Sequence, residues 1–170
     1  ISFSYINAPK TELISPRERY ILTDYPQIKV MQIQFNYLDY NDPAVQSRRC
    51  YEVCRKFGKP VIVMEPVKGG NLVNLPDDGT VLDGLRGGSP ASYAIRFAAG
   101  FPGMLMVLSG MSSLSQMEDN IAFMRDFRPL DERELAAVKR VQEIFHSKNL
   151  IPCTVCRYCT DGCPKHISIP

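Results

Sequence analysis

The chain has 170 residues, enough to bury one sizeable core, so we expect one main domain with a short appendage. An apolar fraction of 45% and a charged fraction of 22% are typical of a globular protein, and a net charge of +2 from scattered residues argues against nucleic-acid binding. The longest apolar run is only strand-length, and no charged-then-apolar leader pattern is present. We therefore expect a cytoplasmic protein without a membrane partner.

Short strands alternate with helices along the chain. The expected strands are Ser2–Ile6, Val30–Phe35, Pro60–Met64 and Met104–Leu108, and we expect the last two to be fully buried. The expected helices cover residues 16–25, 44–57, 90–99, 114–124 and 131–147, and residues 66–89 are expected to form an extended loop. Strands that are each followed by a helix are typical of an α/β fold with a parallel sheet.

Two helix starts carry local signals. Ser89 before Pro90 predicts an N-cap with proline in the first turn, and Asp131 with Glu134 predicts a capping box. Cys50 and Cys54 lie one helical turn apart and are expected in the core, because a disulfide between adjacent turns would be strained.

Four of the six cysteines lie within eleven residues near the C-terminus. They have the spacing Cys-x2-Cys-x2-Cys-x3-Cys-Pro and are Cys153, Cys156, Cys159 and Cys163. This spacing is that of bacterial ferredoxins, whose thiolates are soft ligands for iron, so it predicts a 4Fe-4S cluster. A zinc site is the first alternative, although zinc sites usually combine two pairs of cysteines that are a dozen or more residues apart. A disulfide is the second alternative.

The fourth cysteine allows two arrangements. In two-cluster ferredoxins the last cysteine of such a run binds the other cluster. Cys163 would then belong to a second cluster whose other ligands are absent from this chain, which stops at Pro170. If Cys163 instead folds back, one cluster closes on four local thiolates.

Five segments together resemble one family. They are Q-I-Q-F-N-Y-L-D at 32–39, V-I-V-M-E-P-V-K-G-G at 61–70, L-S-G-M-S-S at 108–113, M-E-D-N at 117–120 and I-P-C-T-V-C-R-Y-C at 151–159. The chain resembles the aldo/keto reductases, in the subgroup with a C-terminal ferredoxin-type extension. The resemblance implies that residues 1–148 form the C-terminal half of a (β/α)8 TIM barrel, strands five to eight, with the last strand at Met106–Ser109. Residues 149–170 would be a truncated ferredoxin-like extension.

The same resemblance implies a nicotinamide cofactor, NADP or NAD. Ligands of such barrels lie at the carboxyl ends of the strands, where glycines and a helix N-terminus can hold phosphates. The phosphate-binding positions would be Lys68, Gly69, Gly70, Gly110 and Ser112. The alternative is that these glycines serve only the loop and the turn in which they occur.

Other parts of the cofactor are assigned by the resemblance alone. Ser4 and Gln32 would bind the nicotinamide carboxamide, with Gln34 as the alternative in a shifted register. Asp119 and Asn120 would lie near the adenine, their alternative being a solvated helix face.

The sequence also departs from the family pattern. The family's catalytic Asp, Tyr, Lys and His lie on and after strands two to four, upstream of Ile1, so no catalytic residue is assigned. Met64 stands where many relatives carry an aromatic residue, and Gln116 stands near where an Arg that grips the 2′-phosphate is common.

We therefore expect the C-terminal portion of a nicotinamide-dependent oxidoreductase with an iron–sulfur module. The intact protein would act on a small carbonyl substrate and exchange electrons with a partner, whereas this chain alone would be inactive. The alternative is a non-catalytic electron-transfer or partner-docking iron–sulfur module on a half-barrel scaffold, and a weaker one is a zinc-stabilised binding module. A half barrel leaves strand edges unpaired, which predicts self-association through those edges.

Overall fold

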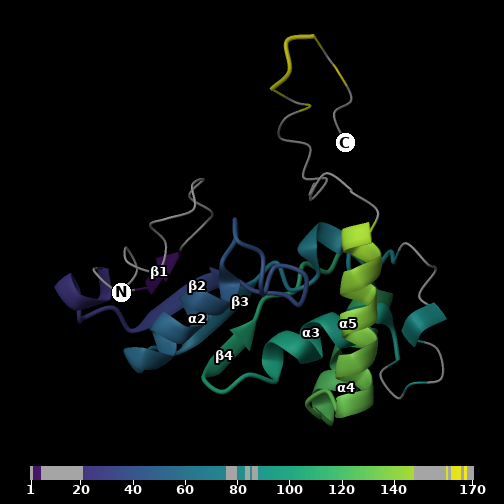
Figure 1. The fold of residues 1–170 in the computed structure, drawn as a ribbon, viewed down its shortest axis with the longest axis horizontal. Helices are drawn as coiled ribbons and strands as arrows, with labels where there is room; N and C mark the ends of the chain where they lie inside the picture. Colours follow the sequence, from purple (N-terminus) through teal and green to yellow (C-terminus); the bar gives the residue numbers. More distant parts are fainter. Residues whose placement is uncertain are drawn as a thin grey trace.

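A four-stranded parallel sheet organises the chain (Figure 1). The computed structural model describes residues 2–4, 21–75, 80–82, 85, 88–147, 160, 162–165 and 167. The strands are β1 (Ser2–Ser4), β2 (Val30–Gln34), β3 (Val61–Met64) and β4 (Met104–Val107). They lie in the order β1-β2-β3-β4, and each neighbouring pair is parallel. The prediction of an α/β fold with a parallel sheet is confirmed.

Helices follow β2, β3 and β4. They are α2 (Ser47–Lys56), α3 (Pro90–Ala99), α4 (Leu114–Arg125) and α5 (Glu132–Ser147). In Figure 1, α2 lies beside β2 and β3, α3 lies beside β4, and α4 and α5 lie beyond α3. Within the predicted helix over 16–25, residues 21–24 are helical and 16–20 lie outside the described residues. Between β3 and α3, the expected loop contains two 3-10 turns, η1 (Lys68–Gly70) and η2 (Thr80–Leu82).

The local helix signals are confirmed in atomic detail. Ser89 caps α3 by accepting a hydrogen bond from the Ser92 backbone N–H at 3.3 Å. Before α5, the Glu134 N–H donates to Asp131 Oδ1 at 2.9 Å, and the Asp131 N–H donates to Glu134 Oε2 at 3.0 Å. The start of α2 is later than predicted because the Asp42 side chain accepts the N–H groups of the two residues before Gln46 and holds them in a turn.

The core lies between the sheet and the helices. Met31 and Ile33 point from β2 into one apolar cluster, where both Cys50 and Cys54 are buried as expected. Phe35, directly after β2, anchors the aromatic part of this cluster. Its ring contacts those of Tyr40, Tyr51, Phe97 and Phe101 at centroid separations of 5.0–6.1 Å. A second cluster includes buried Tyr37 and Tyr93 and joins α3 to α5.

The prediction that β3 and β4 are fully buried is wrong. In β3, Val61 and Val63 are buried, but the alternate residues are only half-buried. In β4, Leu105 is 61% exposed and Met106 is 53% exposed. β4 is the last strand of the sheet, so within the described chain no further strand shields it.

An exposed apolar stripe on α4 adds to the exposed apolar residues of β4. The stripe comprises Leu114, Met117, Ile121 and Met124, which recur three or four residues apart and are all exposed. No residue of α4 is buried. Apolar residues at this spacing normally face a neighbouring element, so β4 and α4 together present a surface suited to one.

No helix in the described part of the chain is long and apolar enough to span a bilayer.

A buried ion pair connects α5 with α3. Arg96 donates two hydrogen bonds to the Glu134 carboxylate, each at 2.8 Å, and its Nε donates to the carbonyl oxygen of Arg128 at 2.9 Å. Both side chains of the pair are less than a tenth exposed. Glu134 thus serves both the capping box and the contact between the two helices.

Replacing Glu134 by alanine should destabilise the fold strongly. The substitution leaves the Arg96 guanidinium buried without its partner, which typically costs about 3–5 kcal/mol. The exposed Glu132→Ala variant on the same helix turn should shift the free energy of unfolding by no more than about 0.5 kcal/mol. Urea unfolding of the two variants beside the parent chain measures the difference. Equal midpoints for the two variants would show that the pair does not hold α5.

Candidate functional site

A cavity of about 620 Å³ opens beyond the carboxyl ends of β3 and β4. Its volume is in the range of small-molecule sites, and this end of a parallel sheet is where α/β proteins usually bind ligands. The chain reaches it from four places, namely the segment after β3, the start of α3, the segment after β4 and the first half of α4. The residues described along its wall are Met64, Glu65, Pro66, Val67, Gly69, Gly70, Val73, Asn74, Ser89, Ala91, Leu108, Ser109, Gly110, Met111, Ser112, Gln116, Asp119 and Asn120.

Six of the predicted cofactor residues converge on this cavity. They come from three separate segments of the sequence and are Gly69, Gly70, Gly110, Ser112, Asp119 and Asn120. The backbone has positive φ at Gly69 (60°) and Gly70 (96°), a conformation that glycine adopts without strain. A Cβ built at Gly70 or Gly110 meets nothing within 4 Å, so open space lies beside both backbones.

Hydrogen bonds fix the polar side chains of α4 at the wall. Asn120 donates from Nδ2 to Ser109 Oγ at 3.0 Å, and Asp119 accepts the hydroxyl of Ser89. The side-chain oxygen of Gln116 accepts the Ser112 backbone N–H at 2.8 Å. By contrast, the backbone N–H groups of Gly110 and Met111 have no hydrogen-bond partner in the described part of the chain. Both residues line the cavity.

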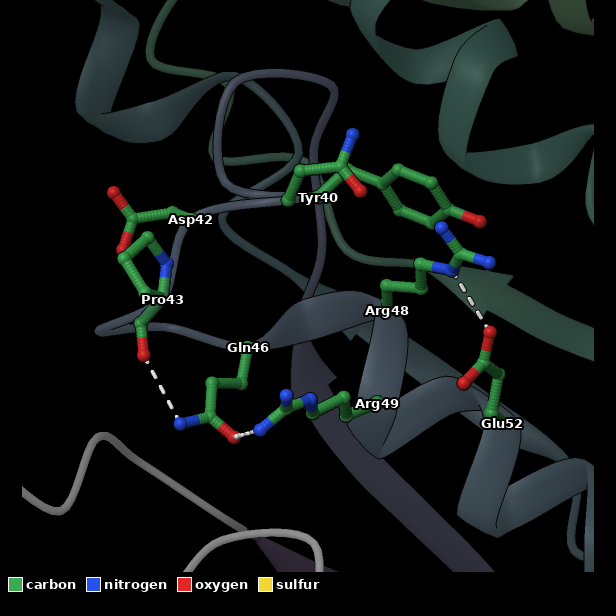
Figure 2. Close-up of a pocket in the computed structure, with 8 residues that line it drawn as sticks. Tyr40, Asp42, Pro43, Gln46, Arg48, Arg49 and Glu52 are labelled. Atoms are coloured by element: carbon green, nitrogen blue, oxygen red, sulfur yellow. Dashed lines mark hydrogen bonds and ion pairs between the residues drawn. The ribbon is translucent and has the colours of Figure 1, made fainter. Parts of the chain in front are cut away.

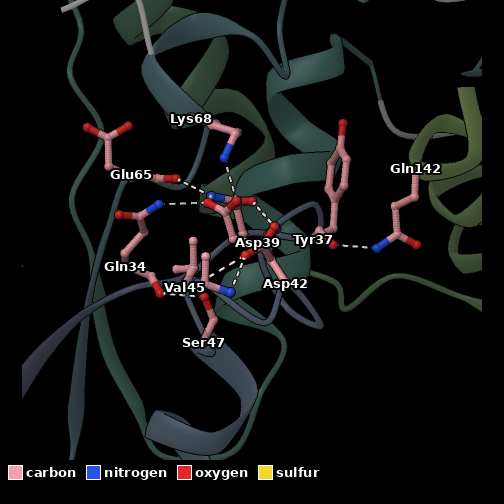
Figure 3. A network of polar contacts seen from close by, with 11 residues as sticks. Gln34, Tyr37, Asp39, Asp42, Val45, Ser47, Glu65, Lys68 and Gln142 are labelled. Atoms are coloured by element: carbon pink, nitrogen blue, oxygen red, sulfur yellow. Dashed lines mark hydrogen bonds and ion pairs between the residues drawn. The ribbon is translucent and has the colours of Figure 1, made fainter. Parts of the chain in front are cut away.

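Lys68, the predicted phosphate-binding charge, is not among the described residues that line this cavity. Its ammonium group pairs with the Asp39 carboxylate, and both side chains are less than a tenth exposed (Figure 3). The backbone at Lys68 has a positive φ of 48°, which is uncommon for a residue with a side chain. The physical reason for the pairing is the buried Asp39 carboxylate, which requires a countercharge in a medium with little water.

Asp39 is the centre of a larger polar network. Gln34 and Asn36 donate to the same carboxylate oxygen, each at 2.7 Å, and Asn36 also donates to the Glu65 carbonyl oxygen at 3.0 Å. Figure 3 shows the Glu65 carboxylate pointing away from this network. The loop after β2 is thereby tied to the segment after β3 that carries Gly69.

The predicted carboxamide-binding residues lie on the strands β1 and β2. Ser4 and Gln32 are neighbours in the parallel register of β1 and β2. Gln32 directs Nε2 toward the Met64 sulfur at 3.6 Å, and Met64 does line the cavity. Gln34, the alternative, donates a hydrogen bond from its side chain to the Asp39 carboxylate. Of the two glutamines, Gln32 thus remains the better placed for a ligand that reaches past Met64.

Most of the cysteine motif lies outside the described residues. The motif residues that lie outside are Cys153, Cys156 and Cys159. The predicted domain boundary at residue 148 also lies outside the described residues. Cys163 is described as half-buried, and its N–H donates to the Thr160 carbonyl oxygen at 3.2 Å. Within the described residues, no group of three or more His, Cys, Asp or Glu side chains is placed to hold a metal ion. The cluster therefore stays a prediction from the spacing.

Sequence reasoning missed Glu65, Ser89 and Ser109 at the cavity. Glu65 has a φ of 55°, which is uncommon for a residue with a side chain, and its Oε2 atom is buried without a hydrogen-bond partner among the described residues. The signal that could have found it is a Glu-Pro pair directly after a buried strand. Ser89 was recognised only as a helix cap, a role that it combines with its bond to Asp119.

A second hollow, of about 520 Å³, lies near the start of α2 (Figure 2). Its charged side chains bond to their neighbours, as Arg48 does to Glu52 at 2.8 Å and Arg49 to Gln46 at 3.4 Å. Burial raises the pKa of Tyr40 above its usual value of 10.0, while nearby Arg48 lowers it less. Exposed pairs of this kind contribute little to the free energy of folding. The described lining of this hollow includes none of the predicted site residues.

Comparisons with known proteins identify the family of this chain. The model of the aldo/keto reductase family matches residues 17–143, which is most of the chain. This chain belongs to the aldo/keto reductase family. The chain is similar in structure to aldo-keto reductase AKR11C1 from Bacillus halodurans in its apo and holo forms, each at 17% sequence identity and a TM-score of 0.54. The matches cover 81% of this chain and 49% and 48% of those two chains, so this aldo/keto reductase chain spans about half their length. No curated protein matches its sequence.

Removing the Lys68 charge should destabilise this aldo/keto reductase chain. Lys68→Met leaves the Asp39 carboxylate buried without its cation, and we expect a loss of about 3–5 kcal/mol in the free energy of unfolding. Lys29→Met, which removes an exposed lysine, is the matched control. Adding Asp39→Asn to Lys68→Met should recover part of the loss in a urea titration. If Lys68→Met unfolds at the same urea concentration as Lys29→Met, the ion pair does not hold the loop.

Proposed function

We propose that this chain is the C-terminal portion, strands five to eight, of a nicotinamide-dependent aldo/keto reductase-like oxidoreductase with an iron–sulfur module. The observation that carries the proposal is the convergence of six predicted cofactor residues on one cavity at the carboxyl ends of β3 and β4. Family membership supports the oxidoreductase class, and four parallel strands in a chain spanning half of a related structure support the half-barrel assignment.

The cavity suits the pyrophosphate of a nicotinamide dinucleotide. The N–H groups of Gly110 and Met111 have no partner in the described chain, and α4 begins just beyond them. Backbone donors at a helix N-terminus are a common way to hold a phosphate. The empty space beside Gly70 and Gly110 lets a ligand approach the backbone closely.

The remaining cofactor positions follow from this placement. Asp119 and Asn120 would lie along the adenosine, while Ser4 and Gln32 would bind the carboxamide of the nicotinamide. When bound, the nicotinamide supplies the hydride chemistry for a small carbonyl substrate. The chain's own residues would bind and orient it.

The described wall of the cavity contains no Tyr, Lys or His side chain. Carbonyl reduction needs a proton donor within hydrogen-bond reach of the substrate oxygen. We therefore propose that this chain binds the cofactor without turning over a carbonyl by itself. No observation in the described residues favours the alternative of a non-catalytic docking module.

Binding without turnover is directly testable. In a fluorescence titration the chain should bind a reduced nicotinamide dinucleotide with a dissociation constant on the order of micromolar. Gly110→Asp should weaken binding at least about tenfold because a carboxylate would face the phosphates, while Gly110→Ala serves as the matched control. Incubation with a panel of aldehydes should leave the cofactor unoxidised.

Two results would contradict the proposal. The first is the absence of micromolar binding for both NADH and NADPH, and the second is protein-dependent oxidation of the cofactor by an aldehyde.

Sedimentation of the same samples also tests the proposed self-association, which the exposed apolar side chains of β4 and α4 support.

The iron–sulfur part of the proposal rests on the spacing of Cys153, Cys156, Cys159 and Cys163. Anaerobic reconstitution with iron and sulfide should load about four irons per chain, and Cys156→Ser should abolish loading. Cys163→Ser separates the two arrangements, because it loses iron only if Cys163 closes the local cluster. Electron paramagnetic resonance of the reduced sample checks the cluster type. Stoichiometric zinc binding without iron uptake would refute the cluster.

A further inference from the structure

An exposed apolar surface extends over β4, α4 and the segment directly after α4. We call it the β4–α4 surface, and its members, each at least 36% exposed, are Leu105, Met106, Leu114, Met117, Ile121, Met124 and Phe127. A hollow of about 180 Å³ joins its two parts, because residues of β4 line it together with Met124 and Phe127. All of the described residues that line this hollow are apolar. Large apolar patches on a protein commonly mark a site at which another protein binds.

The surface faces away from the rest of the chain. Asp119 and Asn120 hold a different side of α4 against the molecule through their bonds to Ser89 and Ser109. β4 is the last strand of the sheet, so its outer edge is unpaired within the described chain. The stripe on α4 and the edge of β4 are therefore both accessible to a neighbouring molecule.

The area of the β4–α4 surface fits a stable interface between two proteins. Covering its seven side chains would remove roughly 700 Å² of accessible surface from this chain, close to the ~800 Å² that each partner contributes to a standard interface. In a two-fold symmetric dimer both copies use the same patch, so this area is buried once on each copy. A second copy of this chain thus offers a surface of equal size and equal apolar character.

Two charged side chains flank the stripe. Glu118 and Arg125 each follow a stripe residue directly, lie about two turns apart and therefore share one flank of α4. Both are exposed, and neither forms an ion pair with another described residue. When two copies of such a helix pack antiparallel, equal flanks face each other, so Glu118 of one copy comes within about one turn of Arg125 of the other. A parallel pair would not bring these opposite charges together.

The antiparallel arrangement also fills the apolar hollow. It places the N-terminal end of α4 in one copy beside the C-terminal end of α4 in the other. Leu114 begins the helix and is 69% exposed, the largest value on the β4–α4 surface. Its side chain would enter the hollow beside Met124 and Phe127 of the second copy. Apolar side chains that fill a pocket of the partner commonly anchor an interface.

We infer that the β4–α4 surface binds a second copy of this chain across a two-fold axis, with the two α4 helices antiparallel. The inference deepens the proposed self-association by naming its surface and its geometry, and it does not depend on cofactor binding. The apolar stripes supply the buried area, and Glu118 and Arg125 set the orientation. Antiparallel helices also place the positive end of one helix dipole beside the negative end of the other.

Sedimentation velocity of the full chain over a concentration series tests the surface. We expect an equilibrium between monomer and dimer with a dissociation constant on the order of micromolar. Leu114→Asp should weaken dimerisation at least about tenfold because it brings a carboxylate to an apolar hollow. Ser115→Asp adds the same charge to the next residue, which is exposed and lies outside the β4–α4 surface, and it should leave the dissociation constant unchanged.

An exchange of charges tests the orientation. At low ionic strength Glu118→Arg and Arg125→Glu should each weaken the dimer at least about threefold, because each substitution brings like charges together. The double variant restores an opposite pair and should recover the dissociation constant of the parent chain to within about twofold. Circular dichroism verifies that every variant is folded.

Each outcome bears on one part of the inference. A chain that stays monomeric throughout the series, or that forms larger assemblies, overturns it. If Leu114→Asp dimerises as tightly as Ser115→Asp, the copies meet elsewhere and the inference fails, while the proposed self-association stands. If the double charge variant is weaker than either single variant, the antiparallel arrangement is wrong. None of the substituted residues lines the larger cavity, so a parent chain that dimerises without binding NADH contradicts the proposed cofactor function alone.

Discussion

The buried pair of Asp39 and Lys68 is the interaction on which the candidate site depends. It connects the loop after β2 with η1 after β3, two segments that are 29 residues apart in the chain. Asn36 strengthens the connection by donating both to Asp39 and to the carbonyl oxygen of Glu65. The segment from Glu65 to Gly70 is therefore held at Glu65 and at Lys68. Because it forms one wall of the cavity, the position of that wall depends on an ion pair outside the cavity.

The same pair also determines the electrostatics of the site. A lysine beside two glycines would ordinarily be read as a phosphate ligand, but here its charge is neutralised by a carboxylate in the core. The cavity keeps Glu65 and Asp119 as its described charges. The phosphate binding that we propose would therefore rely on backbone N–H groups and the start of α4 rather than on Lys68.

A second consequence of the fold is that apolar side chains of β4 and of the stripe on α4 are exposed. A parallel α/β sheet ordinarily covers both of its faces, yet Leu105 and Met106 are more than half exposed. The chain spans about half the length of the related structures, and the apolar surface lies at the sheet edge where a further strand could pair. This surface and the cavity adjoin, since Leu108 and Met111 are exposed and also line the cavity. A neighbour that covered the surface would therefore also shape the ligand site.

The sequence by itself determined the elements of this protein, because strand alternation, helix caps and glycine turns are encoded by residues close together in the chain. The Ser89 cap, the capping box of Asp131 and Glu134, and the order of strands and helices all follow from such local patterns. The predicted glycines and the Asp119–Asn120 pair line one cavity, and their role in binding a cofactor stays a prediction. Only the tertiary structure decided that Lys68 turns inward, that Glu65 joins the cavity and that β4 is exposed. These outcomes depend on desolvation and on partners distant in sequence, and the energy of a buried charge is set by the groups that packing brings beside it.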